Sequence, residues 1–203
     1  MTTKIQTAVI EIVTDWLKYA EENYGLPTRK EDRPAGPKPK GERDCQNEHL
    51  AYEADVKVKL GGYLELELRK RGSNFSVHSE LSLFKNKGWR ADLSVHELGG
   101  PWSRSQKLID SCRAVIEIKY ANYWNPDYAW DGKGNTVVND LIKLNSIESA
   151  PSTPKEEVLK VLLVIDEGHR ISENLIGKLR EQAGKDGIII LSNRSDIFYL
   201  AAR

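Results

Sequence analysis

Apolar positions along the chain repeat with two different periods, which predict helices in some segments and strands in others. From Ile5 to Tyr24 they return every three or four residues, so this segment is predicted to be an amphipathic helix that ends near Gly25 and Pro27. Short apolar runs rich in β-branched residues predict strands. These runs lie at 75–84, 92–95, 114–120, 158–165 and 187–191, with a further helix predicted at 171–183.

Charged residues interrupt two of the predicted strands. Asp92 opens one apolar run, and Glu117 and Lys119 alternate with apolar residues in the next. Side chains two apart on a strand share a face, so Glu117 and Lys119 point the same way while Ile116 and Ile118 enter the core. If the two strands are neighbours, Asp92 can meet this pair.

An Asp and a Glu that converge at the edge of an apolar sheet supply hard, anionic oxygens of the kind that bind Mg²⁺ or Mn²⁺. Lys119 would place an amine beside such a metal. A Glu-x-Lys triplet is common in a chain that is 30% charged, and its other interpretation is the solvated face of a half-buried strand. The apolar flanks of the triplet and the separate strand pattern at Asp92 favour the metal site.

Arg90-x-Asp92 together with Glu117-x-Lys119 resembles the paired motif of the PD-(D/E)xK nuclease superfamily, which has the restriction-endonuclease-like fold. Ala91 stands where that family often has proline, a position that bears no ligand. The resemblance covers roughly residues 45–165. It implies an α/β (α+β) fold in which helices flank a central mixed sheet of four to five strands in the order αβββαβ, with a helix around 140–144.

The segment 53–71 has two consistent interpretations. As a hairpin around Gly61 and Gly62 it pairs apolar residues on one face and lysines with glutamates on the other. As a helix it places acids four positions before bases, but the two glycines would cost about 2 kcal/mol. Local energetics slightly favours the hairpin. The resemblance favours a helix that enters the strand at 75–84, and we adopt the helix.

The resemblance also implies a reaction, the Mg²⁺-dependent hydrolysis of a phosphodiester, with Mn²⁺ able to substitute. The metal ligands would be carboxylate oxygens of Asp92 and Glu117 and the carbonyl of Ile118, and Lys119 would orient the attacking water or stabilise negative charge. Glu80 would bind a second metal or orient Lys119. The expected catalytic residues are therefore Asp92, Glu117, Lys119 and Glu80, and the expected metal ligands are Asp92, Glu117, Ile118 and Glu80.

Three further residues are weaker candidates. The family often takes an extra acid from its first core helix, for which Glu48 and Glu53 are available, and a polar residue from the helix after the site, where Lys143 stands. The other interpretation of the two acids is that they face solvent.

Composition gives no overall attraction to nucleic acid, because 30 basic and 30 acidic residues cancel. Local basic clusters either contact phosphate or are ordinary surface charge: Arg69, Lys70 and Arg71, and Lys85, Lys87 and Arg90. An aromatic group after Lys119 either stacks on bases or pins a loop to the body: Tyr120, Tyr123, Trp124, Tyr128 and Trp130.

Other chemistries have little support. Cys45 and Cys112 lack metal-ligand spacing and the four histidines are dispersed, so neither residue type predicts a metal site. No apolar stretch reaches 18 residues, so we expect a cytoplasmic protein without a membrane span. The run Val161–His169 resembles the acidic strand end of a helicase motor, but no GxxxxGK[ST] phosphate loop accompanies it.

The sequence divides into an N-terminal helix with a proline-rich linker arm at 1–44 and a nuclease-like domain at 45–203. The expected function is that of a metal-dependent DNA endonuclease in restriction, repair or mobile-element biology. Its partner would be nucleic acid, and a homodimer is plausible because cutting both strands of a duplex usually takes two sites. The alternatives are a catalytically inactive nucleic-acid-binding or assembly module on the same fold, and an RNA-processing nuclease.

Overall fold

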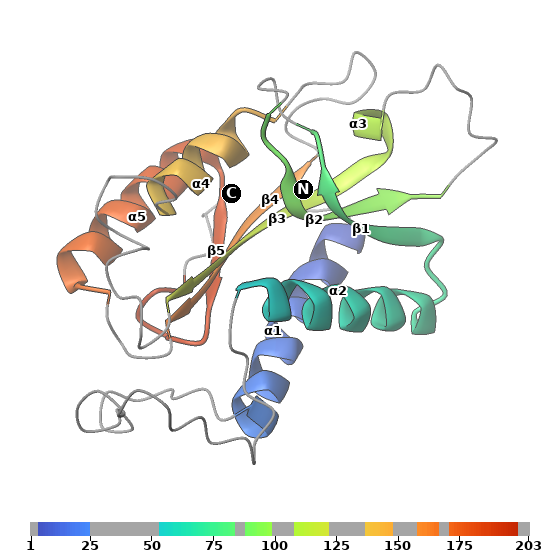
Figure 1. The fold of residues 1–203 in the computed structure, drawn as a ribbon, viewed down its shortest axis with the longest axis horizontal. Coiled ribbons are helices and arrows are strands. Elements are labelled where there is room, and N and C mark those ends of the chain that lie inside the picture. Colours follow the sequence, from blue (N-terminus) through green and yellow to red (C-terminus); the bar gives the residue numbers. More distant parts are fainter. Residues whose placement is uncertain are drawn as a thin grey trace.

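A five-stranded mixed sheet runs through the middle of the molecule, with helices on both faces (Figure 1). The computed structural model describes residues 4–24, 53–83, 88–98, 108–121, 137–147, 158–166 and 171–198. The strands, in their order across the sheet, are β1 (Phe75–Leu81), β2 (Ala91–Glu97), β3 (Cys112–Ala121), β4 (Leu159–Asp166) and β5 (Ile189–Ser192). The helices are α1 (Lys4–Tyr24), α2 (Glu53–Lys70), the single turn α3 (Leu108–Ser111), α4 (Val137–Asn145) and α5 (Glu173–Asp186).

The strand directions divide the sheet into two parts. β1, β2 and β3 are antiparallel neighbours, whereas β3, β4 and β5 run parallel. Parallel neighbours need a crossover, and α4 and α5 lie in the two crossovers. The expected α+β class with a mixed sheet is confirmed, and the element order α2-β1-β2-β3-α4-β4 matches αβββαβ apart from the inserted turn α3.

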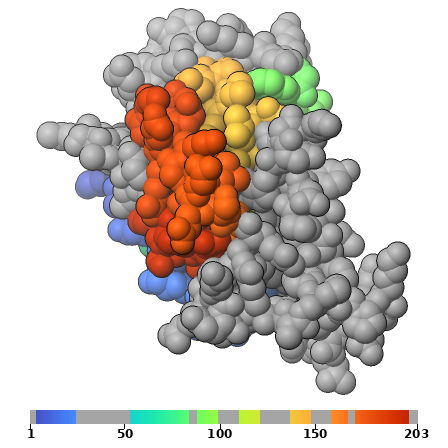
Figure 2. All heavy atoms as spheres, turned by 90° about the vertical axis from the view of Figure 1, so that its left-hand side faces the viewer, coloured from blue at the N-terminus to red at the C-terminus, as the bar shows by residue number. Residues whose placement is uncertain are grey.

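Two hydrophobic cores cover the two faces of the sheet. α1 and α2 pack over one face, where the side chains of Ile116 and Ile118 are buried. α4 and α5 pack over the other, with Val115 from β3, and they lie side by side at the surface (Figure 2). Alternation along β3 therefore places Glu117 and Lys119 on the opposite face from the isoleucines, as the sequence predicts.

The N-terminal helix is part of the first core. α1 packs against α2, β3 and β5, and the apolar stripe that includes Val13 and Trp16 is buried. The segment 4–24 thus folds back on the body of the molecule. The linker predicted at 28–43 lies outside the described residues.

The ambiguous segment 53–71 is a helix, so the hairpin alternative is wrong. Every fourth residue from Val56 to Leu68 is fully buried in the first core, and this burial outweighs the cost of the two glycines. The helix ends in a Schellman motif: Gly72 has φ 69°, its N–H donates to the Arg69 carbonyl (2.9 Å), and Ser73 N–H donates to the Leu68 carbonyl (3.1 Å). Glycine suits this position because the left-handed conformation carries no Cβ penalty.

Two predicted boundaries shift because of capping. α5 starts at Glu173 rather than Ile171, since the Ser172 hydroxyl accepts a hydrogen bond from Leu175 N–H (3.4 Å). It continues to Asp186, beyond Ala183, because Gly187 with φ 64° is the residue that ends it, and β5 therefore begins at Ile189. β1 ends at Leu81, and Phe84 lies outside the described residues.

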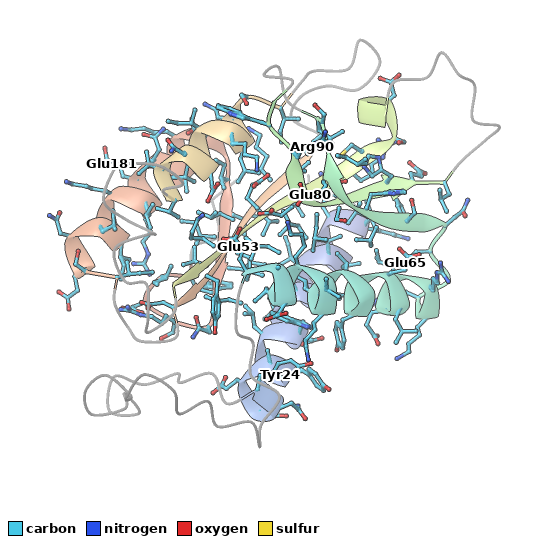
Figure 3. The ribbon with its side chains drawn as sticks, viewed as in Figure 1. Tyr24, Glu53, Glu65, Glu80, Arg90 and Glu181 are labelled. Atoms are coloured by element: carbon cyan, nitrogen blue, oxygen red, sulfur yellow. The ribbon has the colours of Figure 1, made fainter. Side chains whose placement is uncertain are left out.

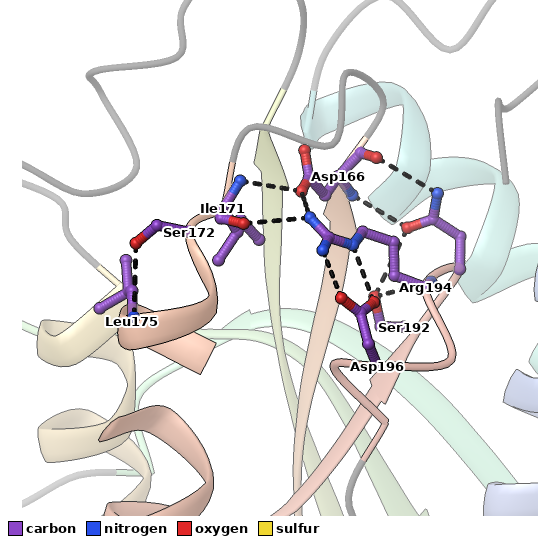
Figure 4. Close-up of polar contacts among 8 residues, drawn as sticks. Asp166, Ile171, Ser172, Leu175, Ser192, Arg194 and Asp196 are labelled. Atoms are coloured by element: carbon purple, nitrogen blue, oxygen red, sulfur yellow. Dashed lines mark hydrogen bonds and ion pairs between the residues drawn. The ribbon is translucent and has the colours of Figure 1, made fainter. Parts of the chain in front are cut away.

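The carboxyl end of β4 is closed by a buried ionic clasp (Figure 4). The fully buried Asp166 carboxylate accepts hydrogen bonds from Arg194 Nη1 (2.6 Å) and Ile171 N–H (3.0 Å). Arg194 Nε also donates to Asp196 (2.9 Å). Asp166 thus ends a buried strand, as expected. Its carboxylate holds the start of α5 and the residues after β5 in place, which is a structural role.

Replacing Gly62 with alanine is expected to raise the free energy of unfolding by about 0.5–1 kcal/mol, because alanine favours a helix more than glycine does. A Cβ at Gly62 meets nothing within 4 Å, whereas one at Gly61 would lie 3.2 Å from Leu93 Cδ2. Gly61→Ala should therefore gain less stability or lose some. Urea-induced unfolding of both variants measures the difference, and a destabilised Gly62→Ala protein would contradict a helix at this position.

Candidate functional site

Eight charged side chains gather where the first turns of α2 meet β1, β2, β3 and α4. We call this group the charge cluster; it consists of Glu53, Lys57, Glu80, Asp92, Glu117, Lys119, Asp140 and Lys143. Glu53 and Glu80 lie toward the middle of the molecule, whereas Glu181 lies on the outer side of α5 (Figure 3). The four expected catalytic residues are all members of the cluster.

The two central carboxylates come from neighbouring antiparallel strands. Leu93 of β2 pairs with Ile116 of β3, so Asp92 and Glu117 are the next residues along each strand. Asp92 Oδ2 accepts a hydrogen bond from Ile118 N–H (2.9 Å), which ties the side chain to the backbone of β3. The expected meeting of Asp92 with the Glu117–Lys119 strand is confirmed.

Each lysine of the cluster contacts carboxylates. Lys143 Nζ lies 2.5 Å from Glu117 Oε2, and Lys57 Nζ lies 3.2 Å from Asp92 Oδ1 while also pairing with Glu80. Lys119 Nζ is held differently, 3.2 Å from Asp140 Oδ2 and 3.6 Å from Glu53 Oε2. Lys57 and Lys143 therefore neutralise the two central carboxylates, and Lys119 pairs with two other acids.

The two helices supply these partners by simple spacing. Glu53 and Lys57 are four residues apart in α2, and Asp140 and Lys143 are three apart in α4, so each helix presents an acid and a lysine on one face. α2 belongs to the first core and α4 to the second. The two hydrophobic cores thus position the charges from opposite faces of the sheet.

Glu117 is the most strongly perturbed member of the cluster. Its side chain is 1% exposed, and burial, followed by the nearby Asp92 carboxylate, raises its pKa well above the usual value despite Lys143. Its second oxygen, Oε1, is buried and has no hydrogen-bond partner within the part of the chain that the structure describes. A buried carboxylate oxygen without a partner is costly, and such an atom commonly marks a site for a ligand.

The pKa values of Lys119 and Asp140 are also raised from their ordinary values. Burial lowers the pKa of Lys119, but Asp140 and Glu53 outweigh it, so the pKa is raised and the amine stays protonated. Burial raises the pKa of Asp140 to about 6, although Lys119 opposes this. Lys119 Nζ and Asp140 Oδ2 are close enough for an ion pair, but their geometry is not that of a hydrogen bond.

Glu80 has an unusual backbone. Among the described residues, Glu80 is the one residue other than glycine with a positive φ (58°). Its carbonyl accepts a hydrogen bond from Arg90 Nη1 (3.0 Å). Strain of this kind is commonly kept where a side chain must be aimed. The Glu80 carboxylate is 53% exposed and contacts Lys57, not the Lys119 amine that it was expected to orient.

The residues present fit a magnesium ion of the kind that uses few protein ligands. Among the described residues, no three acidic, histidine or cysteine side chains converge closely enough to cage a metal. Mg²⁺ is usually bound through one or two carboxylates, with waters and substrate phosphate oxygens completing its shell. Asp92 and Glu117 match that requirement, because they are adjacent and Glu117 Oε1 accepts no hydrogen bond from the described residues.

Lys57 and Asp140 belong to the cluster although neither was expected from the sequence as a site residue. The signal was present, because Lys57 follows Glu53 by one helical turn and Asp140 precedes Lys143 by nearly one. Of the other expectations, Glu48, Lys85, Lys87 and the aromatic residues after Tyr120 lie outside the described residues.

The basic triplet at the end of α2 lies away from the cluster. Arg69 pairs with Glu65 (2.5 Å), Lys70 with Glu67 (2.6 Å), and Arg71 with Glu11 (2.7 Å). Glu65 lies at the opposite end of α2 from Glu53 (Figure 3). These pairings favour the interpretation of the triplet as ordinary surface charge.

No family model, curated protein or solved structure matches this chain. Within the described residues, no helix has the length and apolar character needed to cross a membrane. Inference about function therefore rests on the charge cluster.

In metal-free buffer, Glu117→Gln is expected to unfold with a higher free energy than the parent at pH 8. The pKa of Glu117 is raised in the folded protein, so the stability that its proton confers is present below the ordinary value of 4.5 and is lost as the pH rises through the folded value. Glutamine mimics the protonated carboxyl. The stability gap should be about 1.4 kcal/mol per unit of pKa elevation and should close as the pH falls.

Chemical denaturation between pH 4.5 and pH 8 measures that gap. Glu181→Gln is the matched control, because the exposed Glu181 has its pKa lowered by Lys185 and should gain nothing from the substitution. A Glu117→Gln protein less stable than the parent at pH 8 would show that the ion pair with Lys143 outweighs the burial of the carboxylate.

Proposed function

We propose that this chain is a Mg²⁺-dependent phosphodiesterase that cuts nucleic acid, acting as a DNA endonuclease. The proposal rests on one observation: Asp92 and Glu117 are adjacent on neighbouring strands, with a buried oxygen on Glu117 that no described residue hydrogen-bonds. Lys119 lies on the same face of β3 as Glu117, two residues further on. Two carboxylates beside an ammonium supply what phosphodiester hydrolysis requires, a place for a cation and a positive charge near the reacting phosphate.

Asp92 and Glu117 would hold the metal, with the Ile118 carbonyl as a further ligand. When bound, Mg²⁺ would lower the pKa of a water and neutralise charge that develops on the phosphate. Asp92 is held in place by Ile118 N–H, which leaves its other oxygen paired with Lys57.

Lys119 acts as a cation in this proposal. Its raised pKa keeps it protonated at neutral pH, and a protonated amine cannot accept a proton from water. It can donate hydrogen bonds to the attacking water or to a phosphate oxygen. Asp140 and Glu53 position it, since both carboxylates contact Nζ.

Asp140 is the neighbouring group best suited to accept the proton of the attacking water. General bases work best with a pKa near the operating pH, and burial raises the pKa of Asp140 to about 6. Its position against Lys119 keeps it within the cluster.

DNA as the substrate rests on the resemblance to the PD-(D/E)xK nucleases. A homodimer would follow from the need for two sites to cut both strands of a duplex, and a cytoplasmic location is inferred from the sequence alone. The contacts of Lys57 and Lys143 with Asp92 and Glu117 favour a second candidate, a module that binds nucleic acid or assembles with a partner without binding metal. In that case the lysines are permanent partners of the two carboxylates.

The parent is expected to cut supercoiled plasmid with Mg²⁺ or Mn²⁺ and not with EDTA, and both Asp92→Ala and Lys119→Ala should lose cutting about 100-fold or more. Gel electrophoresis of plasmid, linear duplex, single-stranded DNA and a structured RNA measures activity and substrate class together. Glu181→Ala, which removes an exposed acid of α5, should cut like the parent.

Cutting of RNA alone would reassign the substrate while keeping the chemistry. A folded parent that cuts none of the four substrates with either metal would contradict the catalytic proposal and leave the binding module.

A further inference from the structure

We propose that Lys57 and Lys143 exchange partners when a divalent cation binds: they neutralise Asp92 and Glu117 in the metal-free protein and turn to the phosphates of a DNA strand once the cation takes those carboxylates. This inference rests on the proposed function, because it requires a metal at Asp92 and Glu117. It assigns substrate binding to two lysines of helices α2 and α4 that the motif does not include.

The charge balance of the cluster supports an exchange. Five carboxylates and three ammonium groups leave two negative charges in excess when all are ionised. A divalent cation would bring the total to zero. The metal-free cluster thus repels a phosphate, and the metal-bound cluster no longer does.

The contacts of the two lysines make them the groups that a cation would displace. Lys143 Nζ lies 2.5 Å from Glu117 Oε2, and Lys57 Nζ lies 3.2 Å from Asp92 Oδ1. A cation bound to the same carboxylates would lie within a few ångströms of both amines, and like charges at such distances repel strongly. Glu117 Oε1, which is buried and hydrogen-bonded by no described residue, offers the cation a first contact before Lys143 has moved.

The exposure of the lysines allows them to move. The side chains of Lys57 and Lys143 are 19% and 17% exposed, and each ammonium stands on a flexible four-carbon stem. Lys119 is 8% exposed and pairs with Glu53 and Asp140, which are not the central pair. A cation at Asp92 and Glu117 would therefore release Lys143 from Glu117 and Lys57 from Asp92, with the half-exposed Glu80 as the remaining carboxylate partner of Lys57, and would leave Lys119 held.

The released amines would flank the site from two sides. Lys57 comes from α2 over one face of the sheet, and Lys143 comes from α4 over the other. A flexible ammonium is a common phosphate ligand. A DNA strand whose scissile phosphate reaches the metal would meet one lysine on each side.

Lys143→Gln and Lys57→Gln test the exchange through two affinities of opposite sign. At pH 8, calorimetry should show each variant binding Mn²⁺ about three- to tenfold more tightly than the parent, because a competing cation is gone. With Ca²⁺ present, fluorescence anisotropy should show each variant binding a short labelled DNA duplex more weakly. The dependence of log K on log salt concentration should fall by ~1 per lysine.

Three controls define the result. In EDTA the lysines are engaged with carboxylates, so parent and variants should bind the duplex alike. Lys185→Gln, which removes an exposed lysine of α5 paired with Glu181, should change neither affinity. Lys143→Arg keeps the positive charge and should bind Mn²⁺ like the parent. It provides a test of the charge at this position if Lys143→Gln is too unstable to measure.

The outcomes separate the exchange from the proposed function. Mn²⁺ and duplex affinities that fall together would show that the lysines only hold the fold, and unchanged affinities would show that they do not exchange; either overturns the inference while the parent still binds metal through Asp92. A folded parent that binds no Mn²⁺ overturns both.

Discussion

Two carboxylates that lie side by side in a buried part of a sheet need cations to neutralise them, and this requirement determines which side chains meet in the middle of the molecule. Asp92 and Glu117 are adjacent on neighbouring strands, and Glu117 is fully buried beside a second acid. Each isolated charge would be expensive in such surroundings. Lysines from two helices on opposite faces of the sheet meet that need, so the packing of α2 and α4 and the chemistry of the cluster depend on each other.

The arrangement is not what a purely structural network would require. A buried clasp such as Asp166 with Arg194 satisfies its carboxylate with a guanidinium N–H and a backbone N–H. In the charge cluster, by contrast, Glu117 Oε1 has no hydrogen bond from any described residue, and the pKa of Glu117 is raised. Both networks pair buried carboxylates with cationic side chains, and the difference between them is that Asp166 has its partners whereas the cluster has capacity for a further cation.

Much of the fold and the centre of the site could be predicted from local patterns. Alternation along β3 placed Glu117 and Lys119 opposite the isoleucines, and an apolar run beginning at Asp92 gave the neighbouring strand. Segment 53–71 was harder, because local propensity at Gly61 and Gly62 favours a turn and only burial of Val56 through Leu68 decides for a helix. Tertiary burial is not visible in one sequence.

The partners of the central residues were the least predictable part. Lys57 lies 35 residues before Asp92, which it contacts, and Asp140 lies 21 residues after Lys119 (140 − 119), which it contacts. Spacing within each helix showed that an acid and a lysine share a face, but not which face meets the sheet. That depends on how two separate cores pack. The same holds for Glu80, which was expected to bind a second metal or to orient Lys119 and whose carboxylate contacts Lys57.

Whether Asp92 and Glu117 form a place for a divalent cation can be measured by a calorimetric titration of the full chain with Mn²⁺ at pH 8. The parent is expected to bind Mn²⁺, and a folded Asp92→Asn, Glu117→Gln double variant is not. Failure of the parent to bind, or binding that survives in the double variant, would contradict a cation site at Asp92 and Glu117.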